Sequence, residues 1–245
     1  MRTLLILILI FFNLQAEDKK HDLSIGAGAY FQSQPYTNVD TNIIASPVIF
    51  FDNSIVYAKW TRVGVYFLGA RDEDFAWGFS LTAQPRVYGY KVDDIDGMDE
   101  RKKTFEGGLA FNVKKGSAYV ETMLLTDILD RYDSWIVKSE IGYDFKAGDF
   151  SFYPSLILIY ESAKFVDYYY GVKKSEELGS RKAYSPSAGL MVGVQTYIRH
   201  PITKNISTLV NLRVDKLSNE ASSSPIVNDD YIYSGLLSLI YTFKY

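Results

Sequence analysis

Side chains able to carry out acid-base or nucleophilic chemistry are scarce in this sequence. It has no cysteine, which excludes disulfides, thiolate metal sites and cysteine nucleophiles. Its two histidines are His21, near the N-terminus, and His200, in a predicted turn before Pro201, so neither is placed to activate a serine. The sequence motifs of zinc proteases, P-loop proteins and serine hydrolases are absent. We therefore expect a non-enzyme with no catalytic residues, no metal site and no cofactor.

The overall charge gives no sign of nucleic-acid binding. The formal net charge is -3 and the sequence pI is about 5.5, whereas a nucleic-acid partner would call for a strong basic excess. Aromatic residues make up 16% of the chain, and 20 of them are tyrosines. A tyrosine has an apolar ring and a polar hydroxyl, so this excess suits a surface on which an apolar band borders water.

The N-terminus has the pattern of a secretion signal. Arg2 supplies a positive charge, residues 4–12 form an apolar run, and Ala16 is a small residue before a charged stretch. This pattern predicts a signal peptide at residues 1–16 that is cleaved after Ala16, leaving residues 17–245 as one domain. The alternative is an N-terminal membrane anchor, but the apolar run is much shorter than the roughly 20 residues that a spanning helix needs.

From residue 22 onward, apolar and polar residues alternate in segments separated by turn-forming clusters, as in β-strands. Clear examples are residues 74–87, 135–145 and 205–215. Alternation also describes a soluble sandwich or a lipocalin-like barrel. Aromatic residues at the ends of many segments instead favour the two interfacial girdles of a membrane barrel. The secretion signal and the lack of disulfides suit a bacterial envelope, so we expect a transmembrane barrel in the cell outer membrane.

The segments predict an antiparallel up-and-down β-barrel of about 12 strands with both termini in the periplasm. Short connections alternate with mostly long ones, which we assign to the outer side. The alternative is 10 strands, if residues 54–69 form one strand and residues 43–51, which include Pro47, belong to an outer loop. The twelve expected strands are 22–31, 43–51, 54–60, 62–69, 74–90, 104–114, 117–125, 134–146, 149–161, 184–199, 204–216 and 231–245.

Charged residues on the polar face of these strands are expected to face the barrel interior. They could line a narrow pore, or they could pair with one another and close the interior. The candidate lumen residues are Arg86, Glu106, Lys138, Glu140, Asp144, Arg199, Arg213 and Asp215.

A run of tyrosines, Tyr168, Tyr169 and Tyr170, lies in a predicted outer loop over residues 162–183. Tyrosines in a charged loop could form an adhesive or ligand-binding surface. Equally, they could anchor the loop at the lipid headgroups.

The last strand ends in alternating apolar and aromatic residues. This ending resembles the terminal signal by which the barrel-assembly machinery recognises bacterial outer-membrane proteins. Its residues are Leu237, Leu239, Tyr241, Phe243 and Tyr245.

Several short motifs, taken in order, resemble the MipA/OmpV family of outer-membrane proteins over most of the mature chain. Their order and spacing carry the resemblance. The motifs are Gly26-Ala27-Gly28 with Pro35-Tyr36, Tyr169-Tyr170-Gly171-Val172, Tyr184-x-Pro186-x-Ala188-Gly189, Ser224-Pro225-Ile226-Val227 and Tyr241-Thr242-Phe243.

The resemblance implies a non-enzymatic barrel surrounded by outer-membrane lipid and lipopolysaccharide. In some family members the barrel acts as a scaffold that joins a lytic transglycosylase to a murein synthase in cell-wall remodelling. Such a role would use the short periplasmic turns and residues 17–21. Two alternatives stay open: a small-solute channel, and an adhesin or antigen that acts through the outer loops.

Overall fold

The computed structural model describes residues 22–243. The predicted signal peptide at residues 1–16, His21, and Tyr245 of the C-terminal signal lie outside the described residues.

The chain forms one closed antiparallel β-barrel, in which each strand pairs with its neighbour and the last strand pairs with the first. β8 and β9 both pair with β10 and act as one strand interrupted at Asp144, so the barrel has twelve strands and the alternative of ten is wrong. The strands are β1 (Leu23–Gln32), β2 (Asn42–Asp52), β3 (Val56–Lys59), β4 (Arg62–Arg71), β5 (Phe75–Arg86), β6 (Thr104–Lys115), β7 (Ala118–Asp127), β8 (Trp135–Tyr143), β9 (Phe145–Ala147), β10 (Phe150–Glu161), β11 (Gly189–Pro201), β12 (Ile206–Lys216) and β13 (Tyr231–Phe243).

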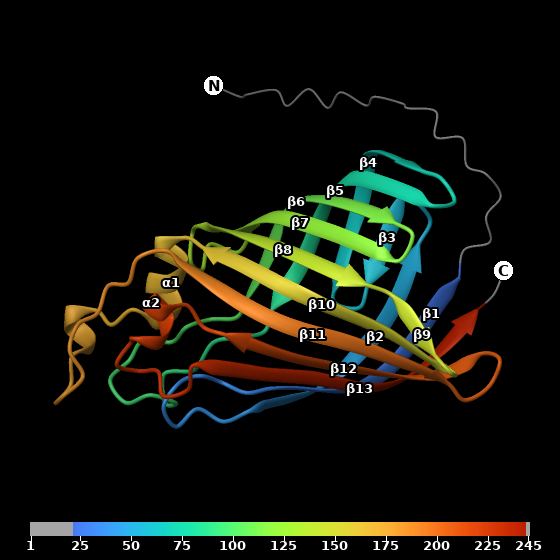
Figure 1. Ribbon diagram of the computed structural model, residues 1–245. Helices are drawn as coiled ribbons and strands as arrows, with labels where there is room; N and C mark the ends of the chain where they lie inside the picture. Colours follow the sequence, from blue (N-terminus) through green and yellow to red (C-terminus); the bar gives the residue numbers. More distant parts are fainter. Residues whose placement is uncertain (1–21, 244–245) are drawn as a thin grey trace, which may run out of the picture.

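The two ends of the barrel differ in the length of their connections (Figure 1). One end, which we call the turn end, carries short turns together with the first and last described residues. The other, the loop end, carries the long connections at 33–41, 87–103, 162–188 and 217–230. β5 ends at Arg86 and β11 begins at Gly189, inside the predicted strands, because Tyr88 and Tyr184 pack among the loops.

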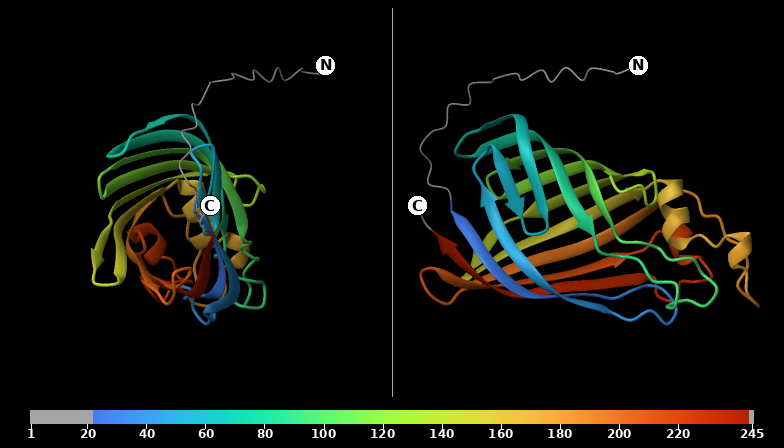
Figure 2. Two further views of the ribbon diagram at one scale, coloured as in Figure 1. Left: turned by 90° about the vertical axis from the view of Figure 1, so that its right-hand side faces the viewer. Right: turned by 180° about the vertical axis from the view of Figure 1, so that it is seen from behind.

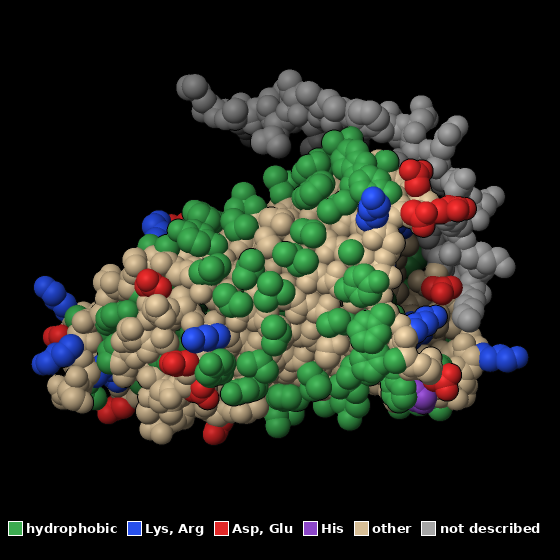
Figure 3. Space-filling model, viewed as in Figure 1, with side chains coloured by type: hydrophobic (Ala, Val, Ile, Leu, Met, Phe, Trp, Pro, Cys, Tyr) green, Lys and Arg blue, Asp and Glu red, His purple; other side chains and the backbone are tan. Residues whose placement is uncertain are grey.

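The outer surface of the barrel wall is apolar, as Figure 3 shows for one face. Aromatic side chains border this surface near both ends. At the loop end Trp135 stacks on Tyr160 with ring centroids 5.9 Å apart, and at the turn end Phe145 stacks on Phe152 at 5.1 Å. An apolar band between two aromatic girdles is the surface of a membrane-spanning barrel.

The loop end is closed by a packed cluster that we call the loop core. It contains residues of α1 (Ala163–Tyr170) and of α2 (Asn219–Ser222), and the 3-10 helix η1 (Lys174–Glu176) follows α1. Tyr36, Phe165 and Ile226 are at most 1% exposed. No helix in the described part of the chain is long and apolar enough to cross a membrane.

A buried ion pair holds the loops of the loop core together. Arg101 in the loop after β5 donates through Nη2 to both carboxylate oxygens of Glu176, each at 3.0 Å. Both side chains are almost fully buried, so removing either one would leave the other charge buried without a partner and would lower stability. The loops at this end are therefore tied to one another as well as to the barrel.

The barrel wall also depends on close packing between glycines and tyrosines of neighbouring strands. Gly142 on β8 lies opposite Tyr119 on β7, and a side-chain carbon added to Gly142 would overlap the Tyr119 ring. The Tyr119 hydroxyl donates to Glu140 Oε1 at 2.8 Å, so the ring has a fixed position above the glycine.

We expect Gly142→Val to lower the free energy of unfolding by about 1 to 3 kcal/mol, because the added methyl groups force the Tyr119 ring away from Glu140. Urea unfolding of the protein in lipid vesicles measures this change. Ala27→Val adds a similar volume on the exposed face of β1 and serves as the control. Equal stability of the two variants would contradict the packing argument.

Candidate functional site

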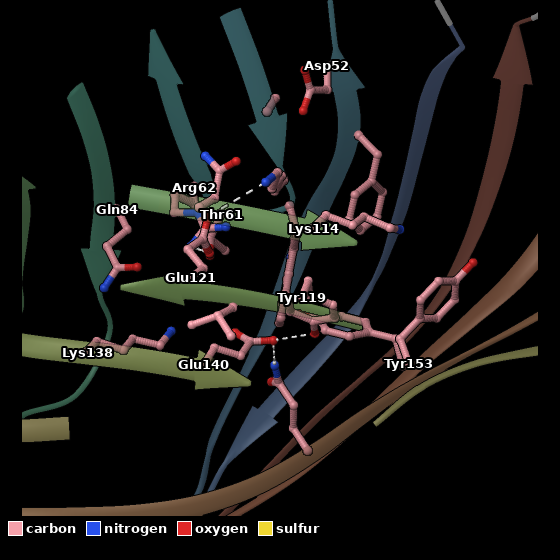
Figure 4. Close-up of a pocket in the computed structure, with 18 of the residues that line it drawn as sticks. Asp52, Thr61, Arg62, Gln84, Lys114, Tyr119, Glu121, Lys138, Glu140 and Tyr153 are labelled. Atoms are coloured by element: carbon pink, nitrogen blue, oxygen red, sulfur yellow. Dashed lines mark hydrogen bonds and ion pairs between the residues drawn. The ribbon is translucent and has the colours of Figure 1, made fainter. Parts of the chain in front are cut away.

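The barrel encloses a cavity of about 1620 Å³ whose lining comes from the inward faces of the strands. The cavity reaches the turn end, where Asp52 and Asp72 line it. Towards the other end it stops at Tyr88, Ile159 and Ile232, which belong to the loop core. The barrel interior is thus a deep cavity that opens at the turn end. Figure 4 shows part of its lining.

All eight charged residues that the sequence assigned to the lumen line this cavity. Most of them pair with another side chain. Arg86 Nε lies 2.5 Å from Glu106 Oε1, and Arg213 donates to both carboxylate oxygens of Asp215 at 2.7 and 2.8 Å. Arg199 donates to Thr242 Oγ1 at 2.8 Å.

Glu106 connects the barrel wall to the loop core. Its side chain is fully buried and accepts hydrogen bonds from Gln84 at 2.9 Å and from the Tyr132 hydroxyl at 3.0 Å, besides its ion pair with Arg86. Burial and the Glu106 carboxylate raise the pKa of Tyr132 above its ordinary value, so the phenol keeps the proton that it donates.

The tip of the short β3–β4 hairpin, residues 59–62, lies inside the barrel. Arg62 forms an ion pair with Glu121 of β7, and Lys59 Nζ lies 3.7 Å from the same carboxylate. Trp60 donates from Nε1 to Ser46 Oγ at 2.9 Å and packs edge-on against the ring of Tyr30 at 5.4 Å. This hairpin tip narrows the cavity by reaching toward strands on the opposite wall.

Sequence analysis missed the hairpin tip and its partner Glu121. The chain around Thr61 was expected to be only a short turn between two strands. Two features of the sequence could have suggested this ion pair. Arg62 lies beside a predicted turn, and Glu121 lies on the inward face of the predicted strand 117–125. Only the fold shows that the two side chains meet.

Lys138 is the inward-facing cation that lacks a bonded partner. Its side chain extends into the cavity near Glu140 (Figure 4). Glu140 instead accepts from Tyr119 and from Gln195, the latter at 3.0 Å. Within residues 22–243, Lys138 makes no hydrogen bond and no ion pair.

The described residues hold no cluster of three or more histidine, aspartate or glutamate side chains that could bind a metal ion. His200, one of the two histidines, stacks on Phe150 at 4.5 Å near the turn end. The side chains that line the cavity form ion pairs and hydrogen bonds.

The loop tyrosines do not form an exposed surface. Tyr169 and Tyr170 are 0% exposed and belong to the loop core, while Tyr168 is partly buried and accepts a hydrogen bond from the Lys102 backbone N–H at 2.8 Å. Burial raises the pKa of Tyr169 and of Tyr170, so both rings stay neutral. The expectation of an adhesive or lipid-anchoring role is corrected here for Tyr169 and Tyr170, because packing against neighbouring rings buries them.

The residues of the expected assembly signal that the structure describes all lie on one face of β13. Leu237, Leu239, Tyr241 and Phe243 are 39% to 63% exposed on the outer surface of the wall. Their recognition by the assembly machinery stays a prediction.

The family model described as MltA-interacting protein MipA matches residues 25–243. The chain belongs to the MipA family. Its relatives YiaT, Omp26La and OmpV are named as outer membrane proteins, and with the closed barrel this places the protein in the outer membrane.

Two relatives of this MipA family chain come from Escherichia coli strain K12. The outer membrane protein YiaT is 26% identical over 213 residues, covering 84% of this chain and 85% of the relative. The protein named MltA-interacting protein is 25% identical over 228 residues, covering 91% and 90%. The solved structure of Neisserial surface protein A aligns over 92% of this chain and 97% of that one, at 13% identity and a TM-score of 0.31.

We expect Arg62→Met to lower the free energy of unfolding by about 3 to 5 kcal/mol, because it leaves the Glu121 carboxylate buried without its main partner. Urea unfolding in vesicles measures the loss. The double variant Arg62→Met, Glu121→Met removes both charges and should recover most of the stability. If the double variant is as unstable as the single one, the ion pair is not what fixes the hairpin tip.

Proposed function

We propose that this protein is a non-enzymatic scaffold of the outer membrane, which holds a lytic transglycosylase and a murein synthase at its periplasmic face during cell-wall remodelling. The name of one relative, MltA-interacting protein, supports a lytic transglycosylase as a partner. The outward wall would contact membrane lipid and lipopolysaccharide, and the final strand would be recognised by the barrel-assembly machinery.

The asymmetry of the two barrel ends is the observation that carries this proposal. The loop core closes the loop end, while the cavity is open at the turn end. A closed loop end supports neither a continuous pore nor ligand binding by the loop tyrosines. In the proposal the turn end therefore faces the periplasm and offers the docking surface.

The charge of the β4–β5 turn favours a basic patch on the partner. The β4–β5 turn carries three consecutive acidic residues, Asp72, Glu73 and Asp74, all exposed. Asp52, the last residue of β2, lines the cavity at the same end and forms an ion pair with Arg71 at 3.4 Å. Complementary charge at an interface guides encounter and fixes orientation. We call residues 72–74 the acidic turn.

A photo-crosslinking residue placed at Glu73 in living cells tests the scaffold proposal. The expected product is a covalent complex with a lytic transglycosylase, identified by mass spectrometry. The same crosslinker placed at Lys91 on the loop end is the control and should not give this product. Recovery of only assembly machinery and lipopolysaccharide from the Glu73 position would reject the proposal.

Neutralising the acidic turn should weaken docking. We expect Asp72→Asn, Glu73→Gln, Asp74→Asn to lower the amount of transglycosylase that copurifies by about five- to tenfold, since exposed charges contribute a few tenths of a kcal/mol each. The matched variant Asp93→Asn, Asp96→Asn, Glu100→Gln removes the same charges from the loop end. Equal recovery from both variants would show that the acidic turn is not the docking surface.

The proposed orientation can be tested separately, because the chain has no cysteine of its own. In intact cells a membrane-impermeant maleimide should label Lys182→Cys at the loop end and leave Lys204→Cys at the turn end unlabelled. Permeabilising the outer membrane should expose Lys204→Cys. The reverse labelling pattern would place the turn end outside the cell.

A further inference from the structure

Between the hairpin tip and the loop end no strand of the described chain lies between β2 and β5, and their ribbons are separated there (Figure 2). We call this gap in the hydrogen-bonded wall the wall opening. β3 is four residues long, and β2 pairs with it only through residues 50–52. The pairing of β4 with β5 ends at Val63 and Ala83. Residues 42–48 of β2 and 84–86 of β5 consequently have no partner strand on the edges that face each other, as far as the described residues go.

Both edges of this wall opening carry a proline whose missing N–H faces the opening. In a strand, the backbone groups of alternate residues point to the same side. The Ile49 carbonyl accepts from Trp60 N on the β3 side, so Pro47 points to that side too. On β5 the Phe75 carbonyl accepts from Asp72 N on the β4 side, and Pro85 lies an even number of residues further on.

Proline at these positions prevents the two edges from pairing with each other or with another strand. Sheets use proline on edge strands for this purpose, whereas a continuous barrel wall has no edges. Two prolines facing one opening from opposite sides indicate that the opening is a built feature of the wall. Because Pro47 faces the opening, it removes no hydrogen bond from the pairing of β2 with β1.

The wall opening lies within the apolar band of the barrel. Ala29 of β1 is in register with Ala45 at the opening and with Leu237 of β13. Leu237 is 63% exposed on the outer surface, and Ile43 at the edge of the opening is 73% exposed. The opening therefore faces lipid chains rather than water.

The same opening is continuous with the barrel cavity. Ile44, Trp60 and Pro85 at the opening line one cavity with Lys138 in the interior. Its volume of about 1620 Å³ exceeds the range of about 300–1000 Å³ that is usual for small-ligand pockets. A path therefore leads from an apolar rim, past the Trp60 ring, to charged side chains.

Positive charge is in excess where this path ends. Lys59 and Arg62 share the Glu121 carboxylate. Lys138 lies near the Glu140 carboxylate but forms no hydrogen bond or ion pair within the described chain, so three cations and two carboxylates lie at or beside the hairpin tip. The Lys138 side chain is half-buried in the cavity wall, where a bound anion would neutralise its ammonium. The surroundings thus combine an apolar entrance with an interior that carries excess positive charge.

We propose that the wall opening is a side entrance through which a single-chain amphiphile with an anionic head passes from the membrane into the barrel. The acyl chain lies against Ile44 and Trp60, and the head binds Lys138 beside the hairpin tip. This inference does not rest on the scaffold proposal, since it concerns the wall and the cavity rather than the acidic turn.

Fluorescence quenching of Trp60 tests the side entrance. The variant Trp77→Phe, Trp135→Phe keeps Trp60 as its single tryptophan, inside the barrel. In phosphatidylcholine bilayers, a fatty acid brominated on its chain should quench Trp60 by about half or more, because bromine quenches only in near contact. Phosphatidylcholine brominated on its chains should leave Trp60 fluorescence nearly unchanged. Heat-modifiable gel migration confirms that each variant is folded.

Two matched pairs of variants locate the route and the head site. A bulky maleimide on Ala45→Cys, at the opening, should abolish the quenching by brominated fatty acid. The same label on Ala29→Cys, its register neighbour on the closed wall, should not. Lys138→Met should raise the fatty-acid concentration that gives half-maximal quenching by about tenfold, as expected for losing one charge-assisted contact. Lys146→Met, an exposed lysine on β9, should leave it unchanged.

Several results would overturn the proposal. Absence of Trp60 quenching in folded protein would show that the chain does not enter. Quenching that persists with the label on Ala45→Cys would exclude the side route. Equal quenching by brominated phosphatidylcholine, or an unchanged Lys138→Met, would reject the anionic single-chain ligand.

Discussion

The backbone hydrogen bond is the interaction on which the rest of this structure depends. In the hydrocarbon of a membrane no water is available to satisfy N–H and C=O groups, so a spanning sheet must close on itself. The pairing of β13 with β1 over ten residue pairs and of β10 with β11 over eleven achieves that closure. The alternation of lipid-facing and cavity-facing side chains then follows from the strand geometry alone.

The wall opening relaxes this rule over several residues of β2 and β5. Irregular or unpaired backbone at membrane depth is tolerated only where it lines a cavity. The edges of β2 and β5 meet this condition because Ile44 and Pro85 belong to the cavity lining. The prolines reduce the number of unsatisfied donors there, and the short β3 makes the opening possible.

Charge pairing inside the barrel has a positional role more than a stabilising one. A buried ion pair gains little over apolar packing, but losing one partner is costly. Arg62 with Glu121 fixes the hairpin tip in the lumen, Arg86 with Glu106 joins β5 to β6 and through Tyr132 to the loops, and Arg101 with Glu176 ties two loops together. Together these pairs make one end of the barrel closed and leave the other open.

The amino-acid sequence by itself determined the barrel, its twelve strands and the inward direction of residues such as Arg86, Lys138 and Arg213. It could do so because a strand's two faces follow from a period of two, which is local information. The aromatic residues at segment ends likewise marked the membrane surface.

The tertiary structure alone decided which inward residues meet and which loops fold inward. Tyr169 and Tyr170 resemble exposed loop residues in sequence, yet packing across four loops buries them. Arg62 and Glu121 are far apart in the chain, so no local pattern couples them. The opening between Pro47 and Pro85 arises because β3, which has four residues, ends partway along the barrel. Only the strand order places β2 and β5 on its two sides, so that the two prolines face each other across it.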